Sequence, residues 1–398
     1  MARKKSKLRS MMSARRLRWS ATRALAACAP SLGRSLAFPT RGVRAVDCAS
    51  TVMEDVREDL RLAATPAETA DILVPAMAFD SGDVGGNPAG HAVQSRQAAL
   101  VEGCDILGHT MTPVLAATGD LVNFDGVTPN WNYAKAALLR ARPAPPGRYA
   151  LLPDVSNYYH FLGNDVLPLV NWLERRPGDA PLTIVTRREI NPMARHVIDA
   201  LARAYPVLRV MEIGALERLT GVTLEWVFAL ATNYEWMPVT RGDADRLAAI
   251  LAAHDAAGGL APAAPGERLY LDRGNAKLRR MTDAEAVDRV LERHGFARFV
   301  ARYDNHAEQV AAFAGARIVV ATHGAGLANL LFCRPGATVV EIFPSNFVKS
   351  TYFWLSRRLG LNYRYVIGGP GDYDQHFAAG ADALDRVLAE VTVAGSDR

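Results

Sequence analysis

The sequence has few cysteines and no long apolar run. Its four cysteines, Cys28, Cys48, Cys104 and Cys333, are widely separated, and none belongs to a CxxC pair. Neither a zinc site nor a disulfide framework is therefore indicated, and a reducing compartment fits best. The longest apolar stretch, from Leu25 to Phe38, is broken by turn and charged residues and falls short of the roughly 18 residues that a membrane span requires. We therefore expect a cytoplasmic protein.

Acidic residues are absent from the first 46 positions. Residues 1–46 hold 12 Lys and Arg and no Asp or Glu, which leaves 34 basic against 41 acidic residues in the rest of the chain. The net charge of +5 thus comes from this arm, and the remainder is acidic. A globular nucleic-acid-binding protein carries its basic surface on the fold itself, so we expect no nucleic acid partner.

The composition of this basic arm has three interpretations. An Arg-rich, acid-free segment is typical of a transit peptide, or of a segment that contacts anionic lipid at the inner face of a membrane. The arm lacks the apolar region and cleavage site of a secretory signal. An upstream start codon or a disordered tail explains it equally well. The sequence therefore predicts a disordered arm and leaves its role open.

Apolar runs alternate with amphipathic segments in the C-terminal part of the chain. Leu269–Leu271, Ile318–Ala321 and Thr338–Ile342 are typical of strands, and a helical pattern follows each of them. Strands that alternate with helices predict an α/β fold with a parallel sheet and right-handed crossovers. Residues 150–254 show the same alternation less regularly, and residues 50–140 give no clear assignment.

Two capping patterns mark helix starts in this part of the chain. Thr282 with Glu285, and Asn305 with Glu308, have the spacing of a capping box. In that motif a side chain at each position satisfies a backbone amide of the first helical turn. We therefore expect one helix to begin after Thr282 and another after Asn305.

A run of small residues, prolines and glycines at 256–267 is the clearest linker. Two α/β domains joined there would have a ligand cleft between them, at the carboxyl ends of their strands. The expected divisions are a basic arm at 1–46, an N-terminal α/β domain at 47–255, the linker at 256–267, a C-terminal α/β domain at 268–370, and a helix or tail at 371–398.

The segment THGAGLAN follows the expected strand Ile318–Ala321 and opens a helical pattern. Gly324 and Gly326 permit tight backbone geometry on either side of Ala325, and amides at a helix start can receive a phosphate. His323 could donate a further hydrogen bond to that anion. The alternative is a plain strand-to-helix turn with a capped histidine.

Three charged residues are expected at the same edge of the sheet. Glu341 lies near the end of an apolar strand, where an acidic residue often binds the hydroxyls of a ribose; alternatively, it pairs with a nearby arginine. Arg273 follows the strand Leu269–Leu271, and Arg280 precedes the next helix. Guanidinium groups suit diphosphate oxygens because of their fork geometry and permanent charge.

Further upstream, the stretch NYYHFLGNDVLP places His160 five residues before Asp165. Either side chain could act as a general base toward a hydroxyl. The residues alone favour a structural role for both, as a core histidine and as a carboxylate at a helix N-terminus. An α/β-hydrolase is excluded because the chain contains no G-x-S-x-G motif.

Two DxD strings occur, at Asp243–Asp245 and Asp372–Asp374. The first opens a helical pattern, where acids are common, and the second lies beyond the expected phosphate-binding region. Neither follows a strand in a position to bridge a diphosphate through Mg²⁺. Because the arginines could replace the cation, the sequence predicts metal independence and no cofactor.

Taken together, the motifs NYYHFL…D…LP, LDRGN…RR and AEQVAAFAGARIVVATHGAGLANLLFCRPGATVVEIFP resemble glycosyltransferase family 61. The similarity covers about residues 150–367 and is densest from Leu269 to Pro344. It implies a GT-B arrangement of two facing Rossmann-like domains, with a nucleotide sugar bound mainly by the C-terminal one. It also implies inverting transfer to a hydroxyl of a glycan acceptor, in cell-surface or capsular polysaccharide synthesis. A non-catalytic nucleotide-sugar-binding or scaffold protein of the same fold is the alternative.

The resemblance also implies roles for individual residues. Glu341 would hold the ribose, while Asp165, with His160 as second choice, would be the base beside the acceptor. Thr282 departs from the family, which commonly has Asn at that position. The residues that would surround the diphosphate are Arg273, Arg280, His323, Gly324, Ala325 and Gly326.

Overall fold

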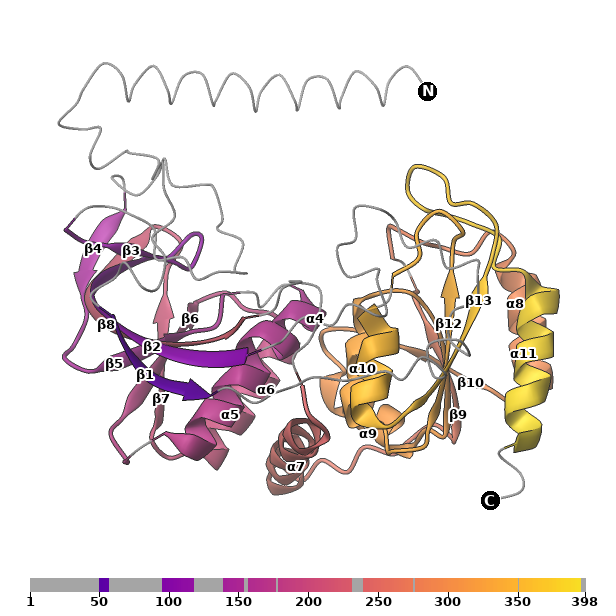
Figure 1. Cartoon of the computed structure of the whole chain (residues 1–398), viewed down its shortest axis with the longest axis horizontal. Helices are drawn as coiled ribbons and strands as arrows, with labels where there is room; N and C mark the ends of the chain where they lie inside the picture. The colour runs from indigo at the N-terminus through magenta and orange to yellow at the C-terminus, as the bar shows by residue number, and fades with distance from the viewer. Residues whose placement is uncertain are drawn as a thin grey trace, which may run out of the picture.

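The structure is a computed structural model with two β-sheets flanked by helices (Figure 1). The basic arm at 1–46 lies outside the part that it describes. Among the described residues, no helix is long and apolar enough to cross a bilayer. The described residues are 50–56, 95–117, 139–153, 157–176, 178–230, 239–274, 276–349 and 351–394.

The first sheet has eight strands in the order β1-β2-β8-β5-β6-β7, with β3 beside β2 and β4 beside β8. Strands β4 to β8 pair in parallel, whereas β1, β2 and β3 add antiparallel pairs at one side. The bounds are β1 (Ser50–Val56), β2 (Ser95–Leu107), β3 (Thr112–Leu115), β4 (Arg140–Pro143), β5 (Arg148–Leu151), β6 (Leu182–Arg187), β7 (Leu208–Ile213) and β8 (Glu217–Leu230).

The prediction of parallel sheets is therefore wrong for this edge, where the long strands β2 and β8 run antiparallel. Their register shifts between Val101 and Cys104, and Gly103 has a φ of 67°. Gly221 in β8 has a φ of 72°. Such bulges interrupt the period-two alternation of side chains, and this explains why the sequence pattern did not reveal the two strands.

The second sheet has five strands, all parallel, in the order β10-β9-β11-β12-β13. Every residue of β11 is buried, as expected for a strand covered on both faces. The alternation predicted from the sequence is confirmed here. The bounds are β9 (Arg268–Asp272), β10 (Ala297–Val300), β11 (Ile318–Thr322), β12 (Thr338–Phe343) and β13 (Asn362–Ile367).

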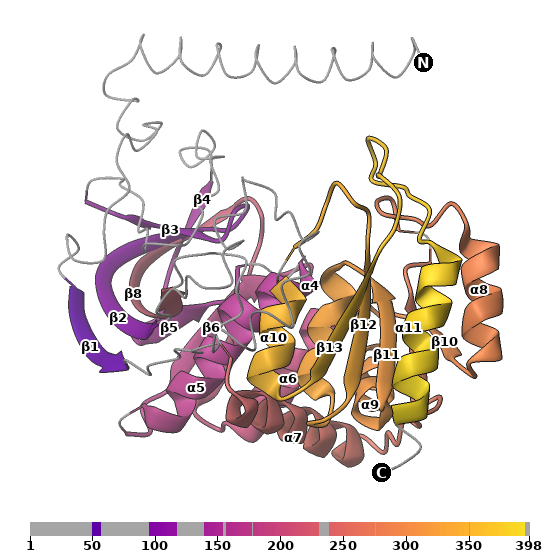
Figure 2. The ribbon, with the colours of Figure 1, turned by 45° about the vertical axis from the view of Figure 1, so that its right-hand side comes forward.

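Helices cover both faces of this second sheet, as Figure 2 shows. Helices α8 and α11 pack on one face and bury the cluster that contains Val290 and Leu388. Helices α9, η3 and α10 lie on the other face, toward the first sheet. Their bounds are α8 (Ala284–Arg293), α9 (His306–Gly315), the 3₁₀ helix η3 (Ala325–Phe332), α10 (Thr351–Leu359) and α11 (Ala381–Ala394).

The first sheet and helices α4 to α7 form what we call the N-terminal half, and the second sheet with α8 to α11 and η3 forms the C-terminal half. One apolar cluster runs through both, from Leu162 and Leu201 to Phe313 and Leu330. Figure 1 shows α7 below the junction of the halves. The helix bounds are α4 (Tyr158–His160), the π-helical turn η2 (Phe161–Val166), α5 (Leu167–Arg175), α6 (Pro192–Ala204) and α7 (Arg241–Ala257).

Neither of the two predicted capping boxes forms. Asp283 precedes α8, and its carboxylate accepts hydrogen bonds from the amides of Ala379 and Gly380 (2.7 and 3.1 Å). The Asn305 side chain turns back and accepts from the amide of Arg302 at 2.8 Å. At α8 a contact to a distant segment, and at α9 a turn in the preceding loop, thus compete successfully with the local caps, which contribute only about 1 kcal/mol each.

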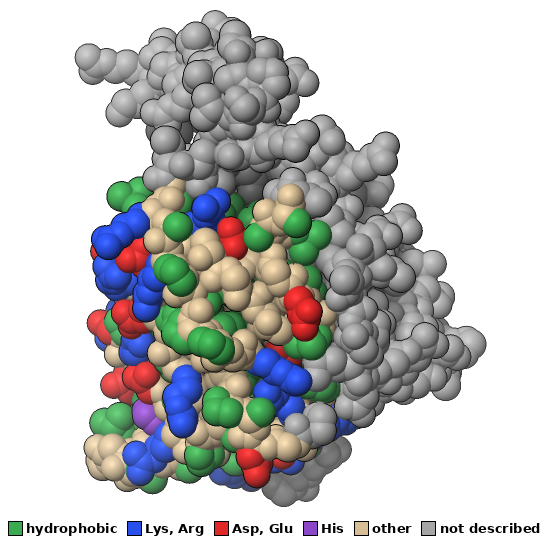
Figure 3. All heavy atoms as spheres, turned by 90° about the vertical axis from the view of Figure 1, so that its left-hand side faces the viewer, with side chains coloured by type: hydrophobic (Ala, Val, Ile, Leu, Met, Phe, Trp, Pro, Cys, Tyr) green, Lys and Arg blue, Asp and Glu red, His purple; other side chains and the backbone are tan. Residues whose placement is uncertain are grey.

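The outer face of the N-terminal half has a mixed surface. Figure 3 shows Lys and Arg side chains interspersed with Asp and Glu among the described residues of that face. The described part of this face therefore presents no broad basic surface of the kind that binds nucleic acid.

Candidate active site

A cavity of about 510 Å³ lies beside the carboxyl ends of β9 and β11. Leu271, Asp272 and Arg273 line it from the end of β9, and the turn after β11 supplies a second wall. The N-terminal half contributes Tyr158 and Met193. The position agrees with the rule that α/β sheets bind ligands outside the carboxyl ends of their strands.

Arg273, which lines this cavity, and Arg279, which does not, converge on one backbone oxygen. Nη1 of Arg273 and Nε of Arg279 each donate a hydrogen bond to the carbonyl oxygen of His323, both at 2.9 Å. Burial and the neighbouring charge of Arg279 lower the pKa of the Arg273 guanidinium to about 10. Within the described residues neither guanidinium forms an ion pair with a carboxylate. The turn therefore carries concentrated positive charge.

The second arginine of this pair is Arg279, not the predicted Arg280. The Arg280 side chain is exposed and lies beside His376, with Nη2 3.3 Å from Nε2 of that ring. Arg279 has a left-handed backbone, with a φ of 56°, which directs its side chain toward the turn. Sequence cannot show which member of an Arg-Arg pair turns inward, because the answer depends on this one dihedral angle.

Glycine at 324 makes the approach of Arg273 sterically feasible. A Cβ at this position would lie 1.8 Å from Nη1 of Arg273. At Gly326 a Cβ would lie 3.0 Å from Cδ2 of Leu271, so that position is also tight. Ala325 begins η3 and is exposed. The structure thus brings Arg273, Gly324, Ala325 and Gly326 together, as predicted.

His323 and Glu341 form a buried pair behind the turn. Nδ1 of His323 lies 2.5 Å from Oε1 of Glu341, and the hydroxyl of Tyr363 donates to Oε2 at 2.6 Å. The Glu341 side chain is fully buried. Its partners are a histidine and a tyrosine rather than an arginine, and the carboxylate does not reach the cavity. Its predicted contact with ribose therefore gains no support from this position.

Burial of this pair also affects its neighbour. Desolvation, with the adjacent Glu341 carboxylate, raises the pKa of Tyr363 well above its ordinary value. The phenol therefore stays protonated and remains a hydrogen-bond donor to Glu341. This donor, together with His323, satisfies a carboxylate that would be costly to bury alone.

His160 and Asp165 do not line the 510 Å³ cavity. Nδ1 of His160 lies 3.1 Å from Oδ1 of Asn164, one helical turn further on. Asp165 is half-buried within the π-helical turn η2. The residue of this motif that does line the cavity is Tyr158. Sequence reasoning missed it because neither tyrosine of the NYYH motif differs from an ordinary core residue.

The predicted metal independence is not tested by the structure. Among the described residues, no three His, Cys, Asp or Glu side chains are grouped closely enough to hold a metal. In the first DxD string, Asp243 forms a capping box with Thr240 at the start of α7. In the second, Asp372 accepts hydrogen bonds from two nearby amides, those of Asp374 and His376.

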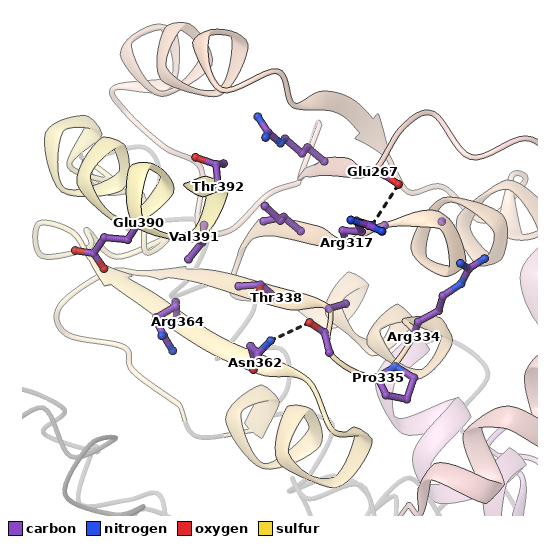
Figure 4. A pocket seen from close by; sticks show the side chains of 16 residues that line it. Glu267, Arg317, Arg334, Pro335, Thr338, Asn362, Arg364, Glu390, Val391 and Thr392 are labelled. Carbon is purple, nitrogen blue, oxygen red and sulfur yellow. Dashed lines mark hydrogen bonds and ion pairs between the residues drawn. The ribbon is translucent and has the colours of Figure 1, made fainter. Parts of the chain in front are cut away.

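A larger cavity, about 850 Å³, lies at the opposite edge of the same sheet (Figure 4). Four arginines line it, but Arg317 pairs with Glu267 at 3.3 Å and Arg268 donates to a backbone carbonyl. Figure 4 shows the side chains of Arg317, Arg334 and Arg364 pointing in different directions. Their charges are therefore dispersed, so the smaller cavity is the better candidate site.

Comparison with known protein families agrees with this geometry. The family model described as Glycosyltransferase 61 matches residues 108–340, which is more than half of the chain and includes the arginines and the glycine turn. No curated protein matches the sequence. This match supports a glycosyltransferase, and the fold is of the α/β class. The chain belongs to glycosyltransferase family 61, as the motifs predicted.

Proposed function

We propose that this glycosyltransferase inverts the anomeric centre of a sugar that it takes from a nucleoside diphosphate. The C-terminal half would bind this donor, and the N-terminal half would bind a glycan acceptor, in a GT-B arrangement. The observation that carries the proposal is the convergence of Arg273 and Arg279 on the carbonyl of His323 without a carboxylate partner. Arg273 lines the cavity, Arg279 shares its carbonyl acceptor, and two like charges held this close are stabilised by an anion of matching charge.

The chemistry of transfer needs this charge. In a single in-line displacement, the bond from the anomeric carbon to the diphosphate breaks while the bond to the acceptor oxygen forms. The transition state has oxocarbenium character, as in glycoside hydrolysis. Negative charge grows on the departing diphosphate, and fixed cations stabilise it without reorganisation. Arg273, Arg279 and the amides at the start of η3 supply that stabilisation.

The acceptor hydroxyl must lose its proton during transfer. Asp165 is our first choice for this base and His160 the second, because both follow Tyr158 on the segment that enters the cavity wall. A positioned base adds about 10²–10⁴-fold to the rate. The proposed acceptor is a cell-surface or capsular glycan, assembled at the cytoplasmic face of the membrane.

Thermal unfolding with a panel of nucleotide sugars tests the donor assignment. A ligand at 100 times its Kd stabilises the folded chain by about 2.7 kcal/mol. We expect at least one donor to raise the unfolding temperature of the wild type and to have little effect on the R273A and R279A variants. R280A is the matched control, because its side chain is exposed and contacts His376.

Release of free nucleoside diphosphate then tests turnover. With a stabilising donor and cell-derived glycans, we expect release that depends on the acceptor and falls sharply in the D165N variant. Tight donor binding without release from any acceptor would instead show a nucleotide-sugar-binding protein. The absence of stabilisation by every donor would overturn the proposed site itself.

A further inference from the structure

A chain of side-chain hydrogen bonds crosses the junction between the halves and ends at the cavity. In the N-terminal half, Nε2 of His196 lies 2.7 Å from Oδ1 of Asp255. Nδ1 of His196 lies 2.7 Å from Nδ1 of His306, and Nε2 of His306 lies 2.9 Å from the hydroxyl of Tyr158. The Tyr158 hydroxyl also lies 2.6 Å from Oδ1 of Asn329. Apart from His196, which is half-buried, these side chains are buried.

The direction of these bonds is fixed at the cavity end. Nε2 of Gln309 donates to the carbonyl of Arg302 at 2.6 Å, so its Oε1 must accept. Nδ2 of Asn329 donates to that Oε1 at 3.0 Å and to the carbonyl of Gly326 at 2.9 Å. Oδ1 of Asn329 therefore faces Tyr158 as an acceptor, and the phenol must donate its only proton to it.

The tautomer of His306 follows from this assignment. Because the Tyr158 proton is already used, the phenol oxygen accepts its bond from Nε2–H of His306. Burial and the charge of His196 lower the pKa of His306 to about 3, so the ring is neutral. Its Nδ1 then carries a lone pair and must accept from Nδ1–H of His196.

At the end of these hydrogen-bonded side chains away from the cavity, the bond between His196 and Asp255 needs one proton more than two neutral imidazole rings supply. His196 uses its Nδ1 proton on His306, so Nε2 bonds to Asp255 only if a second proton lies between them. An imidazolium on a carboxylate is the natural arrangement at 2.7 Å. Helix α7 contributes one more titratable group near this ring, His254, with ring centroids 5.4 Å apart.

We propose that Asp255, His196 and His306 are positioning residues that form a proton-dependent latch between the halves. The latch holds Tyr158, and through Asn329 the carbonyl of Gly326, in the wall of the cavity. When the second proton of His196 is lost, the lone pairs of two acceptor atoms face each other at one of these hydrogen bonds. The closed latch binds one proton more than the open one, so it weakens as the pH rises.

The D255N variant separates this latch from an ordinary ion pair. An amide Nδ2–H at position 255 can donate to Nε2 of a neutral His196, which satisfies the chain without the extra proton. We expect nitrogen NMR of ¹⁵N-histidine-labelled full-length protein at pH 6 to show His196 doubly protonated and His306 as the Nε2–H tautomer. In D255N, His196 becomes the neutral Nδ1–H tautomer, while His306 is unchanged.

The D385N variant is the matched control. Asp385 meets Nε2 of His294 at the same distance, 2.7 Å, but on the outer helices α8 and α11. Its loss leaves the signals of His196 and His306 unchanged. A neutral His196 in the wild type, or His306 as the Nδ1–H tautomer, would overturn the proposal even if D255N failed to fold.

The pH profile of stability supplies a second readout. Relative to D255N, we expect the wild type to lose stability as the pH is raised. Parallel profiles for the two proteins contradict the latch. The effect on the cavity rests on the proposed function, but both measurements are made without a donor. Failure of the latch is thus distinguishable from failure of the donor site.

Discussion

The two edges of the C-terminal sheet both carry arginines, but they arrange them differently. At the amino edge, four arginines line the larger cavity, where they meet glutamate, backbone carbonyls or solvent. At the carboxyl edge, Arg273 and Arg302 line the smaller cavity, and Arg273 meets the same carbonyl oxygen as Arg279. The contrast teaches that two cavities of one sheet can differ in the direction of their charges, and it is this difference, rather than cavity volume or charge count, on which the proposed anion site rests.

Removal of a buried carboxylate gives the largest expected effect. E341A leaves His323 and Tyr363 without their shared partner, and we expect a loss of about 3–5 kcal/mol in the free energy of unfolding. E390A, at the exposed amino edge, should change it by less than about 0.5 kcal/mol. Urea denaturation measures both. Equal losses would remove the distinction between the edges.

Removal of one converging arginine comes next. We expect R273A to weaken donor binding by about 1.5–3 kcal/mol, the range for a hydrogen bond to a charged group. R317A, at the amino edge, should leave donor affinity unchanged, because its guanidinium pairs with Glu267. Calorimetric titration with the stabilising donor decides the matter. A loss of affinity in R317A would move the donor to the larger cavity.

A glycine at each edge sharpens the comparison further. G324A forces a Cβ against the Arg273 guanidinium, so we expect about tenfold weaker donor binding, or about 1.4 kcal/mol. Gly336 at the amino edge has a φ of 82° and open space around its Cβ position. G336A should therefore cost stability through backbone strain while donor affinity stays the same. Unchanged binding in G324A would count against the placement of Arg273.

The smallest expected effect is a difference in acid sensitivity. Because burial lowers the pKa of His306 to about 3, the folded chain keeps this ring neutral while the unfolded chain binds a proton below about pH 6.5. The stability contribution of neutral His306 is thus present above that pH and is lost as the pH falls.

At pH 5.5 the loss relative to pH 7 is about 1.3 kcal/mol. We expect H306Q to lack it, and H294Q, which removes a histidine beside Asp385 on the outer helices, to retain it. Thermal unfolding between pH 7 and 5 compares the three proteins. An identical acid dependence in the wild type and H306Q would contradict the neutral ring.

Sequence reasoning succeeded where local pattern and structure coincide. The apolar run in β11 and the glycines after it gave the parallel sheet, the turn and the position of Arg273. Sequence reasoning failed where the structure depends on backbone geometry or on contacts that no local pattern encodes. Glycine bulges concealed the strand β8, and the left-handed φ of Arg279 determines which arginine faces the turn.

The same limit applies to the N-terminal contribution to the site. Tyr158 forms part of the cavity wall because His306 and Asn329, about 150 residues or more away in sequence, orient its hydroxyl. No local pattern encodes such a contact. The motif around His160 and Asp165 did point to the right segment, although neither of these two side chains lines the cavity.

The atom that both guanidiniums share belongs to the main chain. A replacement of the imidazole at position 323 therefore removes the ring contact with Glu341 but not the carbonyl group that both arginines bind. Natural variation can consequently change the polarity around this turn while the arginine anchor persists. The position most sensitive to mutation is the adjacent Gly324, because the side chain of any larger residue there would take the space that the Arg273 guanidinium occupies.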